Sequence, residues 1–146
     1  MTWLLKSFTE LTSAELYRII QLRNEVFVVE QNCPYQDADN KDPECLHLMG
    51  LDQDKLLAYT RIVPPGLSYK EPSIGRVVTS PSARRTGLGK ELMQRTIAEV
   101  NKRYGNIPIR IGAQFYLISF YGSLGFKEVG EIYYEDGIKH IEMVKS

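Results

Sequence analysis

The chain has 146 residues, of which 43 % are hydrophobic and 25 % charged, a composition typical of a globular protein with one buried core. The formal net charge is zero, which argues against a nucleic acid as the main partner, and no apolar run approaches the ~20 residues that span a bilayer. We therefore expect a single domain over residues 1–146 with no nucleic-acid or membrane partner. The N-terminus lacks the pattern of a signal peptide, so a cytoplasmic location is the expectation.

The N-terminal half of the chain has the patterns of a strand, a helix and a hairpin. Thr12 and Glu15 match a capping box with Leu11 placed as a hydrophobic staple, and apolar residues then recur at helical spacing. A stretch rich in Asp, Asn and Pro follows and is expected to be a loop. The predicted elements are a strand at 3–8, a helix from 12 to about 29, a loop at 32–44, and strands at 45–51 and 55–63 that form a hairpin.

The C-terminal half begins with a loop at 64–73 and a strand that Pro81 stops. A run with helical spacing follows, and Gly105 stands just past its end, where a left-handed cap belongs. Asp136-Gly137 is a strong hairpin signal. The predicted elements are a strand at 74–80, a helix at about 86–103, a strand at 107–113 with Ile107, Ile109 and Ile111 on one face, a short helix at 115–124 ended by Gly125, and strands at 126–135 and 138–144.

This order of elements predicts an α/β fold with a mixed, mostly antiparallel central sheet. Hairpins account for most of the strand connections. The strand–helix–strand unit over residues 74–113 is the one place where a parallel pair is expected.

The two cysteines, Cys33 and Cys45, are too few for a disulfide framework and lack the spacing of a zinc site. We expect both to be reduced thiols. Cys33 has no positive charge beside it in the sequence that would activate it, so a bystander thiol is favoured over a reactive one. No other grouping of His, Cys, Asp and Glu has the spacing of metal ligands, and we expect no metal.

The stretch Arg84-Arg85-Thr86-Gly87-Leu88-Gly89 opens the second long helix. A helix start leaves backbone N–H groups unpaired and carries partial positive charge, and glycines let the backbone approach a ligand closely. With Lys90 behind it, this turn predicts a cradle for a phosphate or pyrophosphate. On this pattern alone, a solvated glycine-rich helix start remains the alternative.

Three phosphate-binding patterns compete for this turn. A P-loop requires Ser or Thr after Gly-Lys, but Glu91 follows Lys90, and Arg84 stands where its first glycine belongs. A dinucleotide fingerprint requires a third glycine where this chain has Leu92. The third pattern, Arg/Gln-x-x-Gly-x-Gly/Ala, fits residues 84–89 outright.

That third pattern resembles the pyrophosphate loop of the GNAT acyltransferases, which bind acyl-coenzyme A. The stretch "FYGSLGF" (120–126) is similar to the second signature of the superfamily, Tyr-x-x-x-Gly-Phe, and the element order also matches. The stretches "LRNEVFVVEQNCPYQDADNKD" (22–42), "LHLMG" (46–50), "IGRVVTS" (74–80) and "YYEDGIKHIEM" (133–143) resemble its ElaA-like branch. The resemblance covers essentially the whole chain.

The resemblance implies a GNAT-type sheet with helices on both faces, splayed between the strands at 74–80 and 107–113. It implies an N-acetyltransferase that moves an acetyl group from acetyl-CoA to a primary amine of a small molecule or a protein by direct attack. A coenzyme-A-sensing module that binds a protein partner without turnover is the alternative. A homodimer is also consistent with the resemblance, and the acceptor is left open.

The resemblance also implies site residues. Backbone N–H groups of the strand at 77–79 would pair with the pantetheine arm and supply an oxyanion donor. Tyr121 would act as the general acid, since a phenol with an ordinary pKa of ~10 is protonated at neutral pH. Gln114 falls where many members carry an Asn that contacts the arm. The implied cofactor-binding residues are Val77, Val78, Thr79, Arg84, Arg85, Thr86, Gly87, Leu88, Gly89, Lys90 and Gln114.

The general base is open between Glu30, at the end of the first helical region, and His47, on an alternating strand. Each also has a structural interpretation, as a solvated helix-end charge and as a hydrogen-bonded core histidine. His140, in the last hairpin, has the same two interpretations as His47.

Arg61 and Arg76 each lie within an apolar strand, and an arginine there needs a partner. They are either ligands of an acidic group on the acceptor or members of ion pairs, and we favour ion pairs. The acidic stretch Asp37, Asp39, Asp42 and Glu44 either attracts a cationic amine or, as favoured here, is a solvated loop.

Overall fold

The computed structural model describes all residues, 1–146, as two antiparallel sheets that lie side by side. The first sheet has the order β1-β2-β3-β4 and the second the order β5-β7-β6. The bounds of the strands are Thr2–Ser7 (β1), Leu46–Asp52 (β2), Lys55–Val63 (β3), Ser73–Thr79 (β4), Ile109–Gln114 (β5), Phe126–Glu135 (β6) and Ile138–Lys145 (β7).

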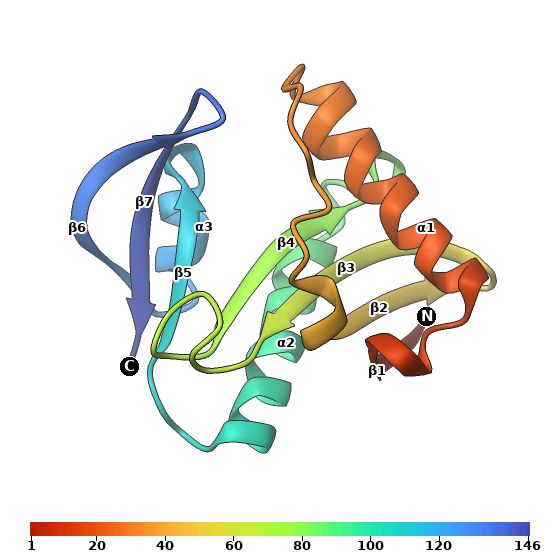
Figure 1. The fold of residues 1–146 in the computed structure, drawn as a ribbon, viewed down its shortest axis with the longest axis horizontal. Coiled ribbons are helices and arrows are strands. Elements are labelled where there is room, and N and C mark those ends of the chain that lie inside the picture. The colour runs from red at the N-terminus through yellow and green to blue at the C-terminus, as the bar shows by residue number, and fades with distance from the viewer.

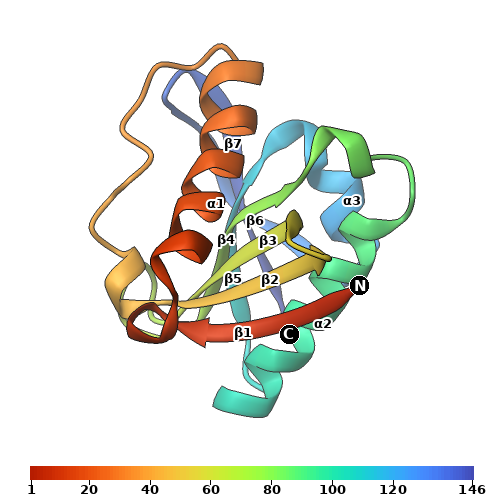
Figure 2. The ribbon, with the colours of Figure 1, turned by 90° about the vertical axis from the view of Figure 1, so that its right-hand side faces the viewer.

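Helices cover both faces of this arrangement, with α1 on one face and α2 and α3 on the other (Figure 2). The helix α1 (Ser13–Arg23) continues as a π-helical segment, η2 (Asn24–Glu30), and α2 (Leu88–Tyr104) connects the two sheets. The short α3 (Ile118–Gly122) follows a 3-10 turn, η5 (Phe115–Leu117). Further 3-10 turns lie at Phe8–Glu10, Asp42–Glu44 and Pro81–Ala83. None of the helices combines the length and the apolar character needed to cross a membrane.

The two sheets separate between β4 and β5. Figure 1 shows the two strands rising from a common lower end and diverging above it. Near that lower end the Arg110 N–H donates to the Pro72 carbonyl at 3.1 Å, but no ladder joins the strands and every ladder in the structure is antiparallel. The expected parallel pair is therefore wrong as a hydrogen-bonded pair, whereas the mixed α/β fold with a splayed sheet is confirmed.

The core follows from the period of two along the strands. Met49 and Tyr59 face α1, where they pack with Ile19. Ile62 faces α2, where it packs with Met93. Each central strand is therefore buried on both faces, which explains the nearly continuous burial of β2 and β3.

Local signals in the sequence predict several of the element ends correctly. The capping box is present, with the Glu15 N–H on Thr12 Oγ1 at 3.1 Å and the Thr12 N–H on Glu15 Oε1 at 2.8 Å. Gly105 ends α2 as expected, but with φ 85° and ψ 179° it takes an extended conformation open to glycine rather than the left-handed helical one. Asp136 and Gly137 have φ 52° and 76°, and two positive φ values in succession are what a type I′ hairpin turn requires.

Three predicted elements differ from the structure. The first helix ends at Arg23, and the valine-rich residues after it form the wider π-helical turns of η2, since β-branched side chains fit an α-helix less well. Ile107 lies outside β5 and is 41 % exposed, because the Pro108 that follows has no N–H for a ladder. The helix expected at 115–124 is a 3-10 turn followed by a single short helix.

Three arginines and three aspartates tie the loop after η2 to the first sheet, and we call them the Arg–Asp network. Every distance between paired N and O atoms in it is 2.7 to 3.3 Å, and Arg23 is only 1 % exposed. The ion-pair interpretation of Arg61 and Arg76 is thus confirmed, and the three aspartates of the acidic stretch are paired rather than solvated, whereas Glu44 is exposed. Its pairs are Arg23 with Asp37 and Asp42, Arg61 with Asp39 and Asp42, and Arg76 with Asp37 and Asp39.

A β-bulge interrupts β4 next to the splay. Tyr59 pairs with Val78 and Arg61 with Gly75, so that two β4 residues, Arg76 and Val77, stand opposite one residue of β3. Arg76 has φ 50°, a conformation that costs a side-chain-bearing residue roughly 1–2 kcal/mol. Its ion pairs with two aspartates of the Arg–Asp network hold the guanidinium, and with it the bulge, in place.

Arg23→Met tests the network. The substitution leaves two buried carboxylates each short of one partner, so we expect the free energy of unfolding to fall by about 3 kcal/mol. Arg18→Met, on the same helix and without an ion pair, is the control and should change it by less than about 0.5 kcal/mol. Urea denaturation of both variants measures the difference, and equal losses would show that the network adds no stability.

The network also predicts an acid-labile fold. Burial alone would raise the pKa of Asp39 and Asp42, but hydrogen bonds from Arg61, and for Asp42 also from Arg23, outweigh it and hold both pKa values below the usual range. Their stabilisation is complete above the unfolded-state pKa of ~3.9 and is lost as the pH falls toward the folded-state values. Urea midpoints should drop steeply below about pH 4, and less steeply in Asp39→Asn/Asp42→Asn; parallel pH profiles would contradict this.

Candidate active site

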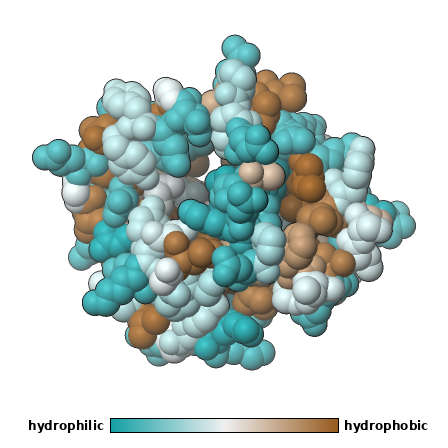
Figure 3. All heavy atoms as spheres, viewed as in Figure 1, coloured by the Kyte–Doolittle hydropathy of each residue, from teal (hydrophilic) through white to brown (hydrophobic).

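A cleft of about 820 Å³ lies between the two sheets at the splay. Its walls come from η2, the loop after it, β4, β5, α3 and the β6–β7 hairpin. In Figure 3 the surface is hollowed between the part built on β1–β4 and the part built on β5–β7. The residues predicted for the arm of the coenzyme and for catalysis therefore meet here, with the exception of His47: Glu30, Val77, Val78, Thr79, Arg84, Gln114 and Tyr121.

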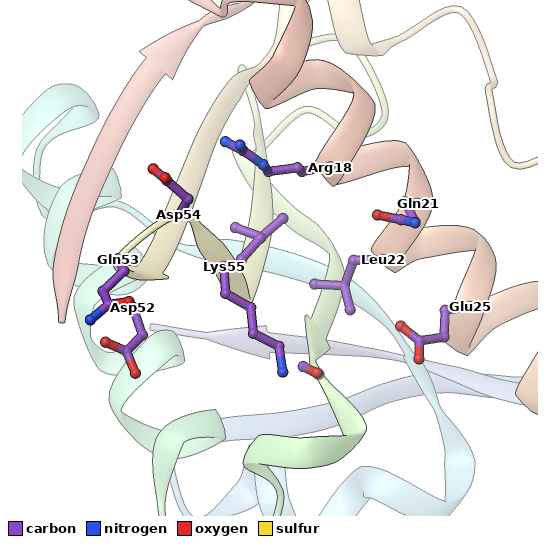
Figure 4. A pocket seen from close by; sticks show the side chains of 10 residues that line it. Arg18, Gln21, Leu22, Glu25, Asp52, Gln53, Asp54 and Lys55 are labelled. Carbon is purple, nitrogen blue, oxygen red and sulfur yellow. The ribbon is translucent and has the colours of Figure 1, made fainter.

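A second pocket, of about 510 Å³, lies between α1 and the β2–β3 turn (Figure 4). Its lining mixes charges of both signs, among them Arg18, Glu25, Asp54 and Lys55. None of the predicted site residues reaches it, so the cleft at the splay is the candidate active site.

The glycine turn at the start of α2 presents a row of unpaired amides. The first backbone hydrogen bond after the turn is from the Glu91 N–H to the Gly87 carbonyl at 3.2 Å, and the N–H groups of residues 85–90 make none. Arg85 and Gly87 have φ 64° and 81°, which turns successive amides toward one side. Thr86 fixes the turn through its hydroxyl, which donates to the Ala83 carbonyl at 2.6 Å. The sequence prediction of an anion cradle fits this geometry.

Arg84, the first residue of the turn, forms a two-pronged ion pair with Glu30 at the end of η2. The Arg84 Nη1–Glu30 Oε2 distance is 2.7 Å, and both side chains are about two-fifths exposed. The hydrogen bonds from Arg84 lower the pKa of the Glu30 carboxyl. Glu30 is therefore the counter-ion of the cradle and, while so paired, a weakened proton acceptor.

Tyr121 lies on α3 and is 6 % exposed. Its ring makes edge-to-face contacts with Phe120 and Phe126, at centroid distances of 5.2 and 6.0 Å. It also lines the cleft, and none of the protein's side-chain hydrogen bonds engages its hydroxyl. Burial raises its pKa well above the ordinary value, so the phenol keeps its proton at neutral pH.

The edge of β4 that faces β5 has no ladder partner, so backbone N–H and C=O groups beside Val77, Val78 and Thr79 are open to the cleft. On the opposite wall Gln114 exchanges side-chain hydrogen bonds with Gln31, at 3.1 and 3.4 Å. An extended ligand can lie along β4 between these walls.

The structure does not bring His47 to the cleft. It is 1 % exposed on the α1 face of β2, with Nδ1 2.6 Å from the Tyr59 hydroxyl and Nε2 3.0 Å from the Asp42 carbonyl. Burial lowers the pKa of the His47 ring. Since both nitrogens are engaged and no ligand can reach them, the expectation of a catalytic His47 is not supported and its role is structural.

Three residues that the sequence reasoning passed over shape the far end of the cleft. A Cβ on Gly112 would lie 2.6 Å from the Tyr133 hydroxyl and 3.2 Å from the Tyr69 hydroxyl, so glycine is required where two phenols converge. A glycine inside an apolar strand often marks such a close approach, and this glycine was the available signal in the sequence.

Cys33 is a buried thiol that donates to the Asp136 carbonyl at 3.2 Å, as a bystander thiol would.

Comparison with known proteins agrees with this geometry. Residues 13–146 match the family model of the acetyltransferase (GNAT) domain, and the chain belongs to this family. A solved acyl-CoA N-acyltransferase from Pseudomonas aeruginosa is 42 % identical and superposes with a TM-score of 0.94 over 100 % of both chains.

The ElaA-like resemblance is confirmed as well. The protein ElaA of Escherichia coli is 42 % identical over 139 residues, 94 % of this chain and 91 % of ElaA, and its crystal structure superposes with a TM-score of 0.92 over 99 % of each chain at 40 % identity. An aminoglycoside 6′-N-acetyltransferase solved with coenzyme A is more distant, at 20 % identity, with a TM-score of 0.72 over 97 % of this chain and 96 % of that one. At that identity it shows the shared fold alone.

Glu30→Gln tests the role of the ion pair. Without the carboxylate, Arg84 is free for an anion, so we expect inorganic pyrophosphate to bind about 2–5-fold more tightly. The free energy of unfolding should change by less than about 1 kcal/mol, as for other exposed pairs. Calorimetric titration measures the affinity, with Glu128→Gln, an exposed residue without an ion pair, as the control. Weaker pyrophosphate binding in Glu30→Gln would contradict the assignment.

Proposed function

We propose that the chain is an acetyl-CoA-dependent N-acetyltransferase that transfers the acetyl group to a primary amine of a small molecule or a protein. The observation that carries the proposal is one of placement. The row of unpaired amides at residues 85–90 adjoins, through Arg84, the same cleft that Tyr121 lines from the other side. An anion-binding turn and a protonated phenol then bracket one elongated cavity.

The cleft and the glycine turn beside it fit coenzyme A in three respects. The free amides of the turn, together with Arg85 and Lys90, match a diphosphate in charge and geometry. The open edge of β4 offers backbone groups to the amides of a pantetheine arm, which would add to the sheet like a strand. Gln114 lies across the cleft from that edge as an amide donor and acceptor. The distant aminoglycoside acetyltransferase, solved with coenzyme A, has the same fold.

The groups present can supply the chemistry of acyl transfer. The bulge at Arg76 and Val77 turns the backbone of β4 out of register with β3, so an N–H of residues 77–79 can donate to the thioester oxygen as its negative charge develops. Tyr121 can give its hydroxyl proton to the departing sulfur, because burial keeps the phenol neutral. The rings of Phe120 and Phe126 make this end of the cleft apolar around Tyr121.

Tyr121→Phe tests the chemistry. We expect kcat to fall about 10²–10³-fold with the Kd for acetyl-CoA within about 2-fold of the unaltered protein. Thiol release from acetyl-CoA over a panel of polyamines, amino sugars and lysine-containing peptides measures turnover, and calorimetry measures binding. Tyr134→Phe, an exposed tyrosine outside the cleft, is the matched control. Unchanged turnover in Tyr121→Phe would remove the phenol from the mechanism.

The same measurements separate this proposal from a coenzyme-A-sensing module. A sensor would bind acetyl-CoA yet release no thiol with any amine or with water. Absence of acetyl-CoA binding by the folded protein would exclude both functions.

A further inference from the structure

The cleft-facing side of the second sheet carries a histidine that sequence reasoning left undecided. His140 on β7 stands between Gln114 on β5 and Tyr133 on β6 in the strand register. Its ring stacks on that of Tyr133, with centroids 5.5 Å apart and an interplanar angle of 26°. It is 7 % exposed, and it lines the cleft together with Tyr121. The imidazole is therefore held rigidly in the wall of the proposed active site.

The hydrogen bond of His140 fixes its tautomer. Nδ1 lies 2.7 Å from the Ile138 carbonyl oxygen, and a carbonyl oxygen only accepts, so Nδ1 carries the proton in the neutral ring. Nε2 then has a free lone pair. The Glu135 carboxylate lies 3.8 Å from Nε2, too far for a hydrogen bond but near enough to stabilise a positive charge on the ring.

Both other candidate bases lack this combination. Glu30 accepts two hydrogen bonds from Arg84, which lower its pKa. His47 has both ring nitrogens engaged outside the cleft. Its Nε2 faces a carbonyl, so its neutral ring carries the proton on Nε2, and the two histidines are held in opposite tautomers.

We propose that His140 is the general base of the acetyl transfer, with Glu135 as the residue that stabilises its protonated form. This inference rests on the proposed function and adds the group that deprotonates the acceptor amine. It goes beyond that function because it names one nitrogen atom, Nε2, and the carboxylate beside it.

The protons balance in four transfers. His140 Nε2 takes one proton from the incoming ammonium group and later releases it to solvent. The neutral amine attacks the thioester carbon, so that the C–N bond forms and the C–S bond breaks. Tyr121 gives its proton to the thiolate, and the phenolate regains one from the nitrogen of the new amide.

The other titratable groups on this wall of the cleft do not form an ion pair with His140. Tyr133 stacks on the ring and Tyr69 lies beyond it over Gly112, and burial raises the pKa of both phenols. Cys33 and Asp136 meet at the turn of the hairpin. Glu135 is the one charged group within ion-pair distance of the imidazole.

The chain contains only two histidines, so NMR of the imidazole groups in the unaltered protein tests the geometry directly. We expect one ring in the Nδ1–H form, assigned to His140 by its absence from His140→Gln, and one in the Nε2–H form. An Nε2–H form for His140 would overturn the proposal.

Kinetics of variants test the role. His140→Gln should lower kcat/KM by about 10²–10³-fold and abolish the acid limb, with the Kd for acetyl-CoA within 2-fold. Glu135→Gln should lower kcat, by less than His140→Gln does, with the Kd for acetyl-CoA within 2-fold, whereas Glu128→Gln, an exposed β6 residue without an ion pair, should leave kcat unchanged. An acid limb that survives in His140→Gln, while acetyl-CoA binds and is turned over, would refute the base and leave the proposed function standing. Absence of acetyl-CoA binding or turnover would refute both.

Discussion

The open edge of β4 is the constraint on which the rest of the structure depends. A strand edge beside another strand normally pairs with it, because unpaired N–H and C=O groups are costly away from water. Here β4 and β5 meet near their first residues and then diverge. The divergence leaves a cavity whose wall is backbone, and it places the start of α2 beside one end of that cavity and the β6–β7 hairpin beside the other.

The Arg–Asp network holds the loop after η2 in place over this cavity. It binds the loop after η2 to β3 and β4, so the residues just before its aspartates are held over the opening. From there Gln31 bonds to Gln114 and Cys33 to the Asp136 carbonyl, which joins the loop to the second sheet. The loop thus spans the splay.

Structural features that depend on a few consecutive residues could be predicted from the sequence. Features that depend on contacts between residues far apart in the sequence could not. The capping box, the Asp136-Gly137 turn and the pyrophosphate pattern each occupy a few consecutive residues with one strongly favoured geometry. The two histidines look alike in sequence, each on an alternating strand beside apolar residues. What separates them is whether the cavity or the Arg–Asp network lies over them in space, and no local pattern records that. The inward orientation of the acidic stretch depends likewise on arginines 14 to 39 residues away.

Position 76 shows how backbone and side chain can make opposite demands on one residue. The left-handed conformation of Arg76 would cost glycine nothing, so backbone energetics alone favour glycine in this bulge. Glycine, however, would remove the only side-chain ion pairs between β4 and the loop after η2. A glycine at position 76 would relieve the backbone strain, but β4 would no longer be bound to the loop after η2 at this point. Arg76→Gly would therefore relax the backbone but leave Asp37 and Asp39 each short of a partner, so the loop beside the cleft would lose its side-chain attachment to β4.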